Sequence, residues 1–252
     1  LIENKDIKNK SKISFFFKES KKNSLEKKII VENFLHGHQL SSEGIFLNKK
    51  FYNVAIADRN YSNITDTKPY IIENGGSTPS IYHNKKFNKI VEKIIYKASK
   101  SLGIDWGIIK ADLVINNGKI KIIELAARIS GGYFATHSIP KVYKIDLVEM
   151  LLREILGLKN KIPKLYIYDY VAQRYFFAPT GFIKKIKGKR SIKKNKNVIK
   201  YEMYLKNNSY QKKIKSHPDR SGMLISSGKN YKKAISNVEL IMSKIKFLKK
   251  FL

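Results

Sequence analysis

Hydrophobic positions along the chain recur with two different periods, and each period predicts one kind of secondary structure. From Phe87 to Ala98 the apolar residues are spaced three and four apart, which predicts a helix that Gly103 ends. A second helix is predicted from about Asp146 to Leu156, before Gly157. The closing stretch NYKKAISNVELIMSKIKFL predicts a third, amphipathic helix.

Short apolar and alternating runs between these helices predict strands. The apolar run 29–31 and the alternating run 39–47 suggest two strands joined through Gly37. Residues 51–61 suggest another strand, and beyond Pro163 the pattern changes to short strands. The chain is therefore expected to be an α/β or α+β protein.

Pro163 and the polar residues before it also predict a domain boundary. We expect a larger first part, residues 1–159, and a small second part, residues 160–252. No internal repeat interrupts this division.

Composition excludes several classes of protein. With 42% hydrophobic residues the chain can form a core, and without cysteine it has no disulfide, thiolate metal site or cysteine nucleophile. No apolar run approaches the roughly 18 to 20 residues that span a bilayer, and the first residues do not resemble a signal peptide. We therefore expect a cytoplasmic protein without a membrane partner.

The formal charge of +31 invites a nucleic-acid interpretation. The charge is nearly all lysine, however, and it is spread along the whole chain, whereas arginine, which binds phosphates and bases best, is scarce. The densest basic run, residues 182–200, is expected to be a solvated strand and loop. Nucleic acid is therefore not the favoured partner.

The most apolar hairpin contains two carboxylates. IKADLVI and KIKIIEL flank an Asn-Gly turn, the strongest short hairpin signal. Lys110 and Asp112 should share one face of the first strand, and Ile122 and Glu124 one face of the second. If both carboxylates lie on the same face, they can bind one Mg²⁺, which prefers oxygen ligands.

Residues just beyond the hairpin favour an anion. Arg128 follows the second strand, and Gly131 with Gly132 lets backbone N–H groups approach an anion closely. These features predict a site for a metal-bound phosphate. The alternative is a surface hairpin whose Asp112 and Glu124 pair with nearby lysines.

Five motifs in order resemble those of the ATP-grasp superfamily. IIVENFLHGHQLSSEGIF is similar to the family's adenine-contacting hinge and the strand after it, and IKADLVINNGKIKIIELAARISGG is similar to its metal-binding hairpin. PYIIENGGSTPS, SLGIDWG and KIDLVEMLLREILG fall in the family's order. The match is most specific to the carboxylate–amine (amino-acid) ligase branch and covers roughly residues 24–157, and the tail resembles the small C-terminal domain of such ligases.

This resemblance implies a fold and a nucleotide site. The fold would be an ATP-grasp C-terminal subdomain, with a mixed, largely antiparallel sheet and flanking helices, plus a small C-terminal α+β domain. Glu32 and the backbone of Asn33, Phe34 and Leu35 would contact adenine. Gln39 lies where the family usually has a glutamate that holds the ribose hydroxyls.

The resemblance also implies a metal and a phosphate site. Asp112 and Glu124 fall on the Mg²⁺ ligands, with Mn²⁺ as the alternative metal. Ala126 falls where many members have an asparagine ligand, which leaves the binding of a second ion open. Arg128 would neutralise the transferred phosphoryl group and the substrate carboxylate.

The remaining implied roles concern the anion and the amine. Gly131 with Gly132 would stabilise the developing anion. Glu43, Glu73 and His137 are candidates for holding the amine substrate.

The implied reaction joins a small-molecule carboxylate to a small-molecule amine at the expense of ATP. The carboxylate attacks the γ-phosphate, and the amine then attacks the resulting acyl phosphate to give an amide. The family's N-terminal domain and glycine-rich phosphate loop would precede the hinge, where this chain has about thirty residues. We therefore expect the C-terminal part of a longer ligase, inactive alone, with the missing part supplied in cis or in trans.

Two alternative interpretations remain open. One is a degenerate ATP-grasp module kept for binding, for which Ala126 together with Gln39 is the distinguishing feature. Another is a basic nucleic-acid-binding protein. A homodimer formed through the small C-terminal domain is compatible with the ligase interpretation.

Overall fold

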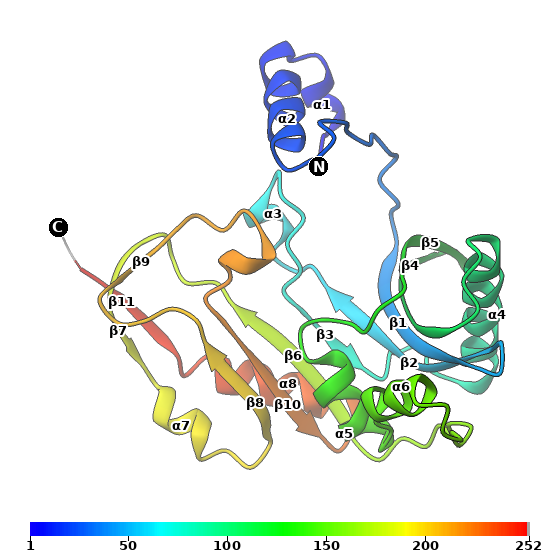
Figure 1. Ribbon diagram of the computed structural model, residues 1–252. Coiled ribbons are helices and arrows are strands. Elements are labelled where there is room, and N and C mark those ends of the chain that lie inside the picture. The colour runs from blue at the N-terminus through cyan, green and yellow to red at the C-terminus, as the bar shows by residue number, and fades with distance from the viewer. Residues whose placement is uncertain (251–252) are drawn as a thin grey trace.

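The computed structural model describes residues 1–250, apart from the side chain of Lys193 (Figure 1). The strands are β1 (His38–Leu47), β2 (Lys50–Asn60), β3 (Gly75–Thr78), β4 (Gly107–Asn116), β5 (Lys119–Ala126), β6 (Tyr170–Phe176), β7 (Gly181–Lys187), β8 (Val198–Met203), β9 (Ser209–Gln211), β10 (Gly222–Gly228) and β11 (Lys246–Lys249). The helices are α1 (Asn4–Ile7), α2 (Lys10–Lys22), α3 (Ile64–Thr67), α4 (Lys85–Ser101), η1 (Phe134–Ser138), α5 (Ile139–Tyr143), α6 (Leu147–Ile155), α7 (Lys189–Lys193), η2 (His217–Asp219) and α8 (Tyr231–Met242).

Eight strands form one sheet in the order β5-β4-β1-β2-β3-β6-β10-β8, and each neighbouring pair is antiparallel. Tight turns make this possible, because Asn48 and Lys49 between β1 and β2 have positive φ angles. Asn117 and Gly118 do the same between β4 and β5, which confirms the predicted hairpin. A second sheet has the order β11-β7-β9.

Helix α4 covers one face of the sheet at β1, β2 and β4 (Figure 1). The Asn84 side chain caps the helix by accepting the Phe87 N–H, and Val91 and Ile95 are fully buried against the sheet. Gly103 takes a positive φ just past the helix end, as expected of a stop signal. The helix predicted here is confirmed.

The opposite face of the same strands is divided into an apolar half and a polar half. The apolar half, with Ile45 on β1 and Ile108 on β4, packs against η1, α5 and α6. Helix α6 begins at the predicted place, where the Asp146 side chain accepts two backbone N–H groups, and Gly157 follows its end with a positive φ. The polar half carries Ser41, Arg59, Lys110 and Asp112, which are open to a cleft.

The sheet continues across the boundary expected at Pro163, because β6, β10 and β8 belong to the same eight-stranded sheet as β1. Helix α8 packs against β6 and β10 around Leu224 and Val238. The division into 1–159 and 160–252 therefore stays a prediction. The closing helix was predicted too long, since α8 ends at Met242 and Lys246–Lys249 pairs with β7 instead.

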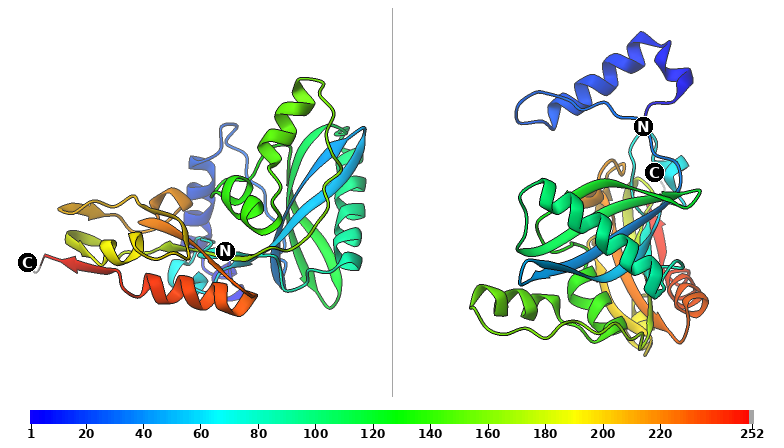
Figure 2. Two further views of the ribbon diagram at one scale, coloured as in Figure 1. Left: turned by 90° about the horizontal axis from the view of Figure 1, so that it is seen from below. Right: turned by 90° about the vertical axis from the view of Figure 1, so that its right-hand side faces the viewer.

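The N-terminal helices α1 and α2 stand apart from the rest of the molecule (Figure 2). They contact the segment after α3, where the Tyr70 hydroxyl donates to Glu19 Oε2 of α2 at 3.4 Å. An extended segment leads from α2 to β1, and the strand predicted over 29–31 is wrong. Ile30 and Val31 lie exposed. An apolar run forms a strand only where a neighbouring strand exchanges hydrogen bonds with it, and none of the described strands pairs with this segment. Among the residues described, no helix is long and apolar enough to cross a membrane.

Candidate functional site

A large cleft lies over the polar half of the sheet. Its volume is about 1810 Å³, more than a small metabolite needs. Its walls include the segment 29–36, the N-terminal helices, the hairpin β4–β5 and the turn η2. Segments from both ends of the chain therefore meet around one space.

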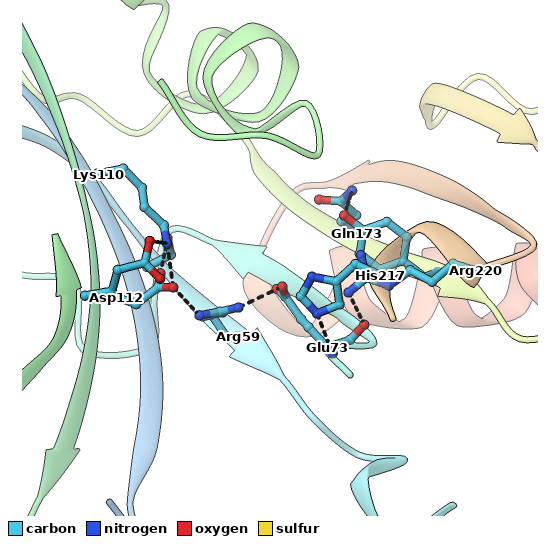
Figure 3. Close-up of polar contacts among 10 residues, drawn as sticks. Arg59, Glu73, Lys110, Asp112, Gln173, His217 and Arg220 are labelled. Carbon is cyan, nitrogen blue, oxygen red and sulfur yellow. Dashed lines mark hydrogen bonds and ion pairs between the residues drawn. The ribbon is translucent and has the colours of Figure 1, made fainter. Parts of the chain in front are cut away.

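Asp112 is the centre of a buried ionic cluster in this cleft (Figure 3). Its Oδ2 lies 2.6 Å from Arg59 Nη1 and 2.5 Å from Lys110 Nζ, and its Oδ1 accepts from Ser41 at 3.2 Å. Three neighbouring strands, β1, β2 and β4, supply these groups. Two cations therefore balance the negative charge of this buried carboxylate.

A β-bulge brings Glu124 to the same face as Asp112. Asp112 pairs with Glu124 but Leu113 pairs with Ile122, so Ile123 is an extra residue on β5. The prediction that Ile122 and Glu124 share one face is therefore wrong, because Ile122 packs toward α4. Without the bulge, regular pairing would have turned Glu124 toward the core. Glu124 instead faces the cleft, 3.6 Å from Lys110 Nζ.

A chain of contacts links this cluster to the C-terminal part of the molecule. Arg59 Nη2 also contacts Glu73 Oε2 at 3.1 Å, and Arg220 Nη2 donates to the Glu73 carbonyl at 2.5 Å (Figure 3). The Glu73 N–H donates to His217 Nε2 at 3.4 Å. Arg220 lies over the Tyr175 ring at 3.6 Å from its centroid.

Burial and charge set the protonation of these groups. Burial alone would lower the pKa of Arg59, but Glu73 and Asp112 outweigh it and raise that pKa above its usual value. Burial, helped by Arg220 and Arg59, lowers the pKa of His217 to about 4. Burial also raises the pKa of Tyr175 to about 12. At neutral pH the imidazole and the phenol are therefore both uncharged.

Glu43 is fully buried at the edge of the cluster. Its Oε1 accepts the Ser130 N–H at 2.8 Å, while its Oε2 has no partner within the part of the chain that the structure describes. Burial raises the pKa of Glu43, although the bond from Ser130 and the charges of Arg128 and Lys110 oppose this. Glu43 therefore holds the loop after β5 rather than facing the cleft.

Most of the residues predicted to form the site line the cleft. They are Glu32, Asn33, Phe34, Leu35, Gln39, Glu73, Asp112, Glu124, Arg128, Gly131 and Gly132. Arg128 is exposed and donates to the Ile129 carbonyl at 3.1 Å. The cations that contact Asp112 and Glu124 are instead Arg59 and Lys110. Glu43 and His137 are not among the lining residues, and His137 instead contacts Thr136 and the Tyr133 ring. The roles of all these residues stay predictions.

Sequence reasoning missed Arg59, Arg220 and His217. One signal could have found the arginines, because only six of the 51 basic Lys and Arg residues are arginine and three of those six line the cleft. In a chain this rich in lysine, each arginine is a candidate for a position that needs a planar, multidentate cation.

The donor set of the hairpin fits one Mg²⁺. Asp112 and Glu124 are adjacent carboxylates on one face, and Mg²⁺ commonly takes one or two carboxylates and completes its shell with phosphate and water. Arg59 and Lys110 together already place a charge of +2 against Asp112, and this equals the charge of one Mg²⁺. No group of three or more His, Cys, Asp or Glu suited to a metal occurs within residues 1–250, and Ala126 adds no ligand.

Fold and site together define a class: an α+β protein whose antiparallel sheet presents two opposed carboxylates and nearby cations to a large cleft. A family model described as "ATP-grasp domain" matches residues 7–132, half of the chain, and a second, described as "L-amino acid ligase C-terminal domain 2", matches residues 174–248. The chain belongs to the ATP-grasp family. No curated protein sequence matches it.

Several solved structures share the fold. An L-amino acid ligase from Bacillus licheniformis has 16% identity and a TM-score of 0.74 over 86% of this chain and 55% of that one. Phosphoribosylglycinamide synthetase from Anaerococcus prevotii has 17% identity and a TM-score of 0.71 over 96% and 61%. The biotin carboxylase domain of Hydrogenobacter thermophilus 2-oxoglutarate carboxylase, solved with MgADP and bicarbonate, has 11% identity and a TM-score of 0.67 over 95% and 53%. The chain therefore spans only about half to three-fifths of the structures it matches.

Proposed function

We propose that this chain forms the metal- and substrate-binding part of an ATP-dependent carboxylate–amine ligase. The observation that carries the proposal is the pair Asp112 and Glu124, opposed across the hairpin at the cleft and flanked by Arg59 and Lys110. The bulge at Ile123 supports it, because bulges next to active sites commonly turn a side chain toward the site.

The proposed reaction proceeds through an acyl phosphate. A substrate carboxylate attacks the γ-phosphate of ATP, and an amine then displaces phosphate from the acyl phosphate to give an amide. No covalent bond to the enzyme forms, so the protein contributes positioning and charge neutralisation. We place the phosphate beside Asp112, where Lys110 and Arg59 supply two partly buried cations.

The other predicted residues fit the same reaction. Asp112 and Glu124 would hold Mg²⁺, which neutralises phosphate charge when bound. The segment Glu32–Leu35, exposed up to Phe34, would contact adenine, with Gln39 at the ribose. Glu73 is the better candidate for the amine, because it lines the cleft and Glu43 does not, although the Glu73 carboxylate also contacts Arg59 at 3.1 Å.

Replacing Glu124 by glutamine tests this proposal. In the natural polypeptide that contains this chain, Glu124→Gln should abolish substrate-dependent phosphate release, because it removes a metal ligand. Folding should change little, since the side chain is half exposed. The matched control is Glu149→Gln on α6, an exposed glutamate outside the cleft, which should leave phosphate release unchanged. Normal turnover in Glu124→Gln would remove the hairpin from the mechanism.

One observation favours a second candidate, a module that binds nucleotide without turnover. Both oxygens of Asp112 already accept from Ser41, Lys110 or Arg59, and Ala126 pairs with Lys110 where a further ligand could stand. Thermal unfolding with and without Mg²⁺-ADP, combined with the phosphate-release assay, separates the two candidates. Stabilisation by Mg²⁺-ADP without any turnover would favour the binding module.

A further inference from the structure

Positive charge is spread along the whole chain, but negative charge is not. Residues 177–218 contain thirteen lysines and arginines and a single acidic residue, Glu202, and residues 240–250 contain four lysines and no acidic residue. These two stretches supply β7, β9 and β11, which are the three strands of the second sheet. A general enrichment in lysine would add basic residues without removing the acidic ones, so this part of the molecule requires its own explanation.

The second sheet has one buried face and one exposed face. Ile183 and Ile186 of β7 are buried in the core that also contains Val238 of α8. Neighbouring side chains on a strand point to opposite faces. The register therefore places three opposed pairs of exposed side chains on the other face, which are Phe182 with Tyr210, Lys185 with Leu248 and Lys187 with Lys246. We call these six residues the outer face.

Aromatic and apolar side chains of the outer face lie among its lysines. Phe182 is 40% exposed, Tyr210 63% and Leu248 38%. Directly opposed residues on neighbouring strands have Cβ atoms about 4.5–5.5 Å apart, so the two rings are adjacent. None of the three strands contains an aspartate or a glutamate. The outer face therefore offers two adjacent rings beside lysines, with no carboxylate on the same strands.

The combination of rings and lysines indicates the chemistry of a partner. Such a partner carries repeated negative charges for the lysines and flat apolar groups for the rings. Single-stranded nucleic acid has both, because its phosphates repeat along the strand and its unpaired bases stack on aromatic side chains. A duplex presents the same phosphates but keeps the faces of its bases stacked inside. The rings therefore favour a single strand.

Two other occupants fit the outer face less well. A second copy of the chain, related by twofold symmetry, would bring the same patch against itself and so place lysines against lysines. An anionic bilayer would attract the lysines, but its binding strength also depends on the apolar area that is buried. Only three apolar side chains of the outer face are exposed, and two of them are less than half exposed.

We propose that the outer face binds single-stranded nucleic acid, with bases on Phe182 and Tyr210 and phosphates at Lys185, Lys187 and Lys246. Binding should tolerate many sequences, because every base has a flat face that can stack. None of these residues lines the cleft, and the second sheet lies at the opposite end of the molecule from the hairpin β4–β5 (Figure 1). The inference is therefore independent of the proposed ligase function.

Fluorescence anisotropy with labelled oligo(U) and oligo(dT) of about 12 nucleotides tests the inference. Both are titrated into the natural polypeptide that contains this chain, at a series of salt concentrations, beside a duplex of the same length. Tyr210→Ile removes one ring but keeps strand propensity, and it should weaken single-strand binding about 5- to 100-fold. Tyr210→Phe retains the ring and should bind as wild type does. If Tyr210→Ile does not fold, Phe182→Ile replaces it.

The lysines are tested through the salt dependence of binding. Replacing Lys185, Lys187 and Lys246 together by glutamine should reduce the slope of log K against log salt by about 2, because each phosphate contact contributes about 0.7. The matched control replaces three exposed lysines of α4 by glutamine and so has the same net charge; these are Lys86, Lys93 and Lys97. Tyr96→Ile, also on α4, is the control for the ring. Both controls should bind nearly as wild type does.

Each outcome supports or overturns the inference. Loss of single-strand binding in the outer-face variants alone, with folding confirmed by circular dichroism, supports it. Equal losses in the α4 controls would mean that net charge, rather than the outer face, binds the strand. Equal affinity for duplex and single strand, with no effect of the ring variant, would overturn the inference in the same way. Absence of binding at physiological salt also overturns it, and binding to phosphatidylserine-containing vesicles instead would assign the outer face to a membrane.

Discussion

Asp112 and Glu124 face each other across one hairpin, yet their removal should affect stability very differently. Asp112 has a side-chain exposure of 8% and contacts two cations within 2.6 Å, whereas Glu124 is 53% exposed with one contact at 3.6 Å. We expect Asp112→Asn to destabilise the fold strongly and Glu124→Gln to change stability little.

The structure sets the size of this difference. Removing one partner of a buried ion pair costs about 3–5 kcal/mol, because the other charge stays buried. Arg59 retains Glu73, and Lys110 can turn to Glu124, so the loss for Asp112→Asn should be near about 3 kcal/mol. An exposed pair contributes about 0–1 kcal/mol. In a chain of this size that predicts a fall in Tm of about 6–12 °C for Asp112→Asn and less than about 4 °C for Glu124→Gln.

Thermal and urea unfolding followed by circular dichroism, with EDTA present, provide the measurement. A third variant, Lys110→Met, tests the cause, because it removes one of the two cations that Asp112→Asn deprives of this partner. Combined with Asp112→Asn it should recover at least about 1 kcal/mol relative to the sum of the single losses. Equal losses for both carboxylates, or strictly additive effects with Lys110→Met, would refute the reasoning.

Three further predictions concern protonation and backbone conformation. Burial raises the pKa of Glu43 above its usual value of 4.5, so the folded state holds this proton more tightly than the unfolded state. Wild type should therefore lose stability relative to Glu43→Gln as pH rises through and above 4.5, which urea unfolding at a series of pH values measures. The lowered pKa of His217, about 4 against 6.5, has the opposite sign, so wild type should lose stability relative to His217→Gln as pH falls from 6.5 to 4. An NMR titration of the imidazole checks the pKa itself. Gly132→Ala should destabilise the fold by about 1–2 kcal/mol, because φ is +64° and a Cβ would lie 2.6 Å from Tyr175 Oη. At Gly131 a Cβ would meet no atom within 4 Å, so Gly131→Ala is the control and should leave the thermal melt nearly unchanged.

Local pattern was sufficient for helix α4 and for the hairpin of β4 and β5, but not for α2, which was not predicted from the sequence. The helix ending before Gly103 and the turn at Asn117 and Gly118 depend on side-chain spacing and on positive φ angles, which are properties of adjacent residues. The prediction over 29–31 was wrong because a strand depends on a partner that the local sequence does not reveal. The overlong closing helix was wrong for the same reason, since β11 pairs with β7.

For the site, the sequence by itself determined two carboxylates in an apolar hairpin, an arginine and a pair of glycines beyond it, because these lie within one short stretch. Only the tertiary structure decided that Glu124 faces Asp112, since the bulge at Ile123 depends on pairing between β4 and β5. It alone brought Arg220 to Glu73, which are 147 residues apart. Periodicity assigns each side chain to a face, whereas the order of strands in the sheet decides which distant faces meet.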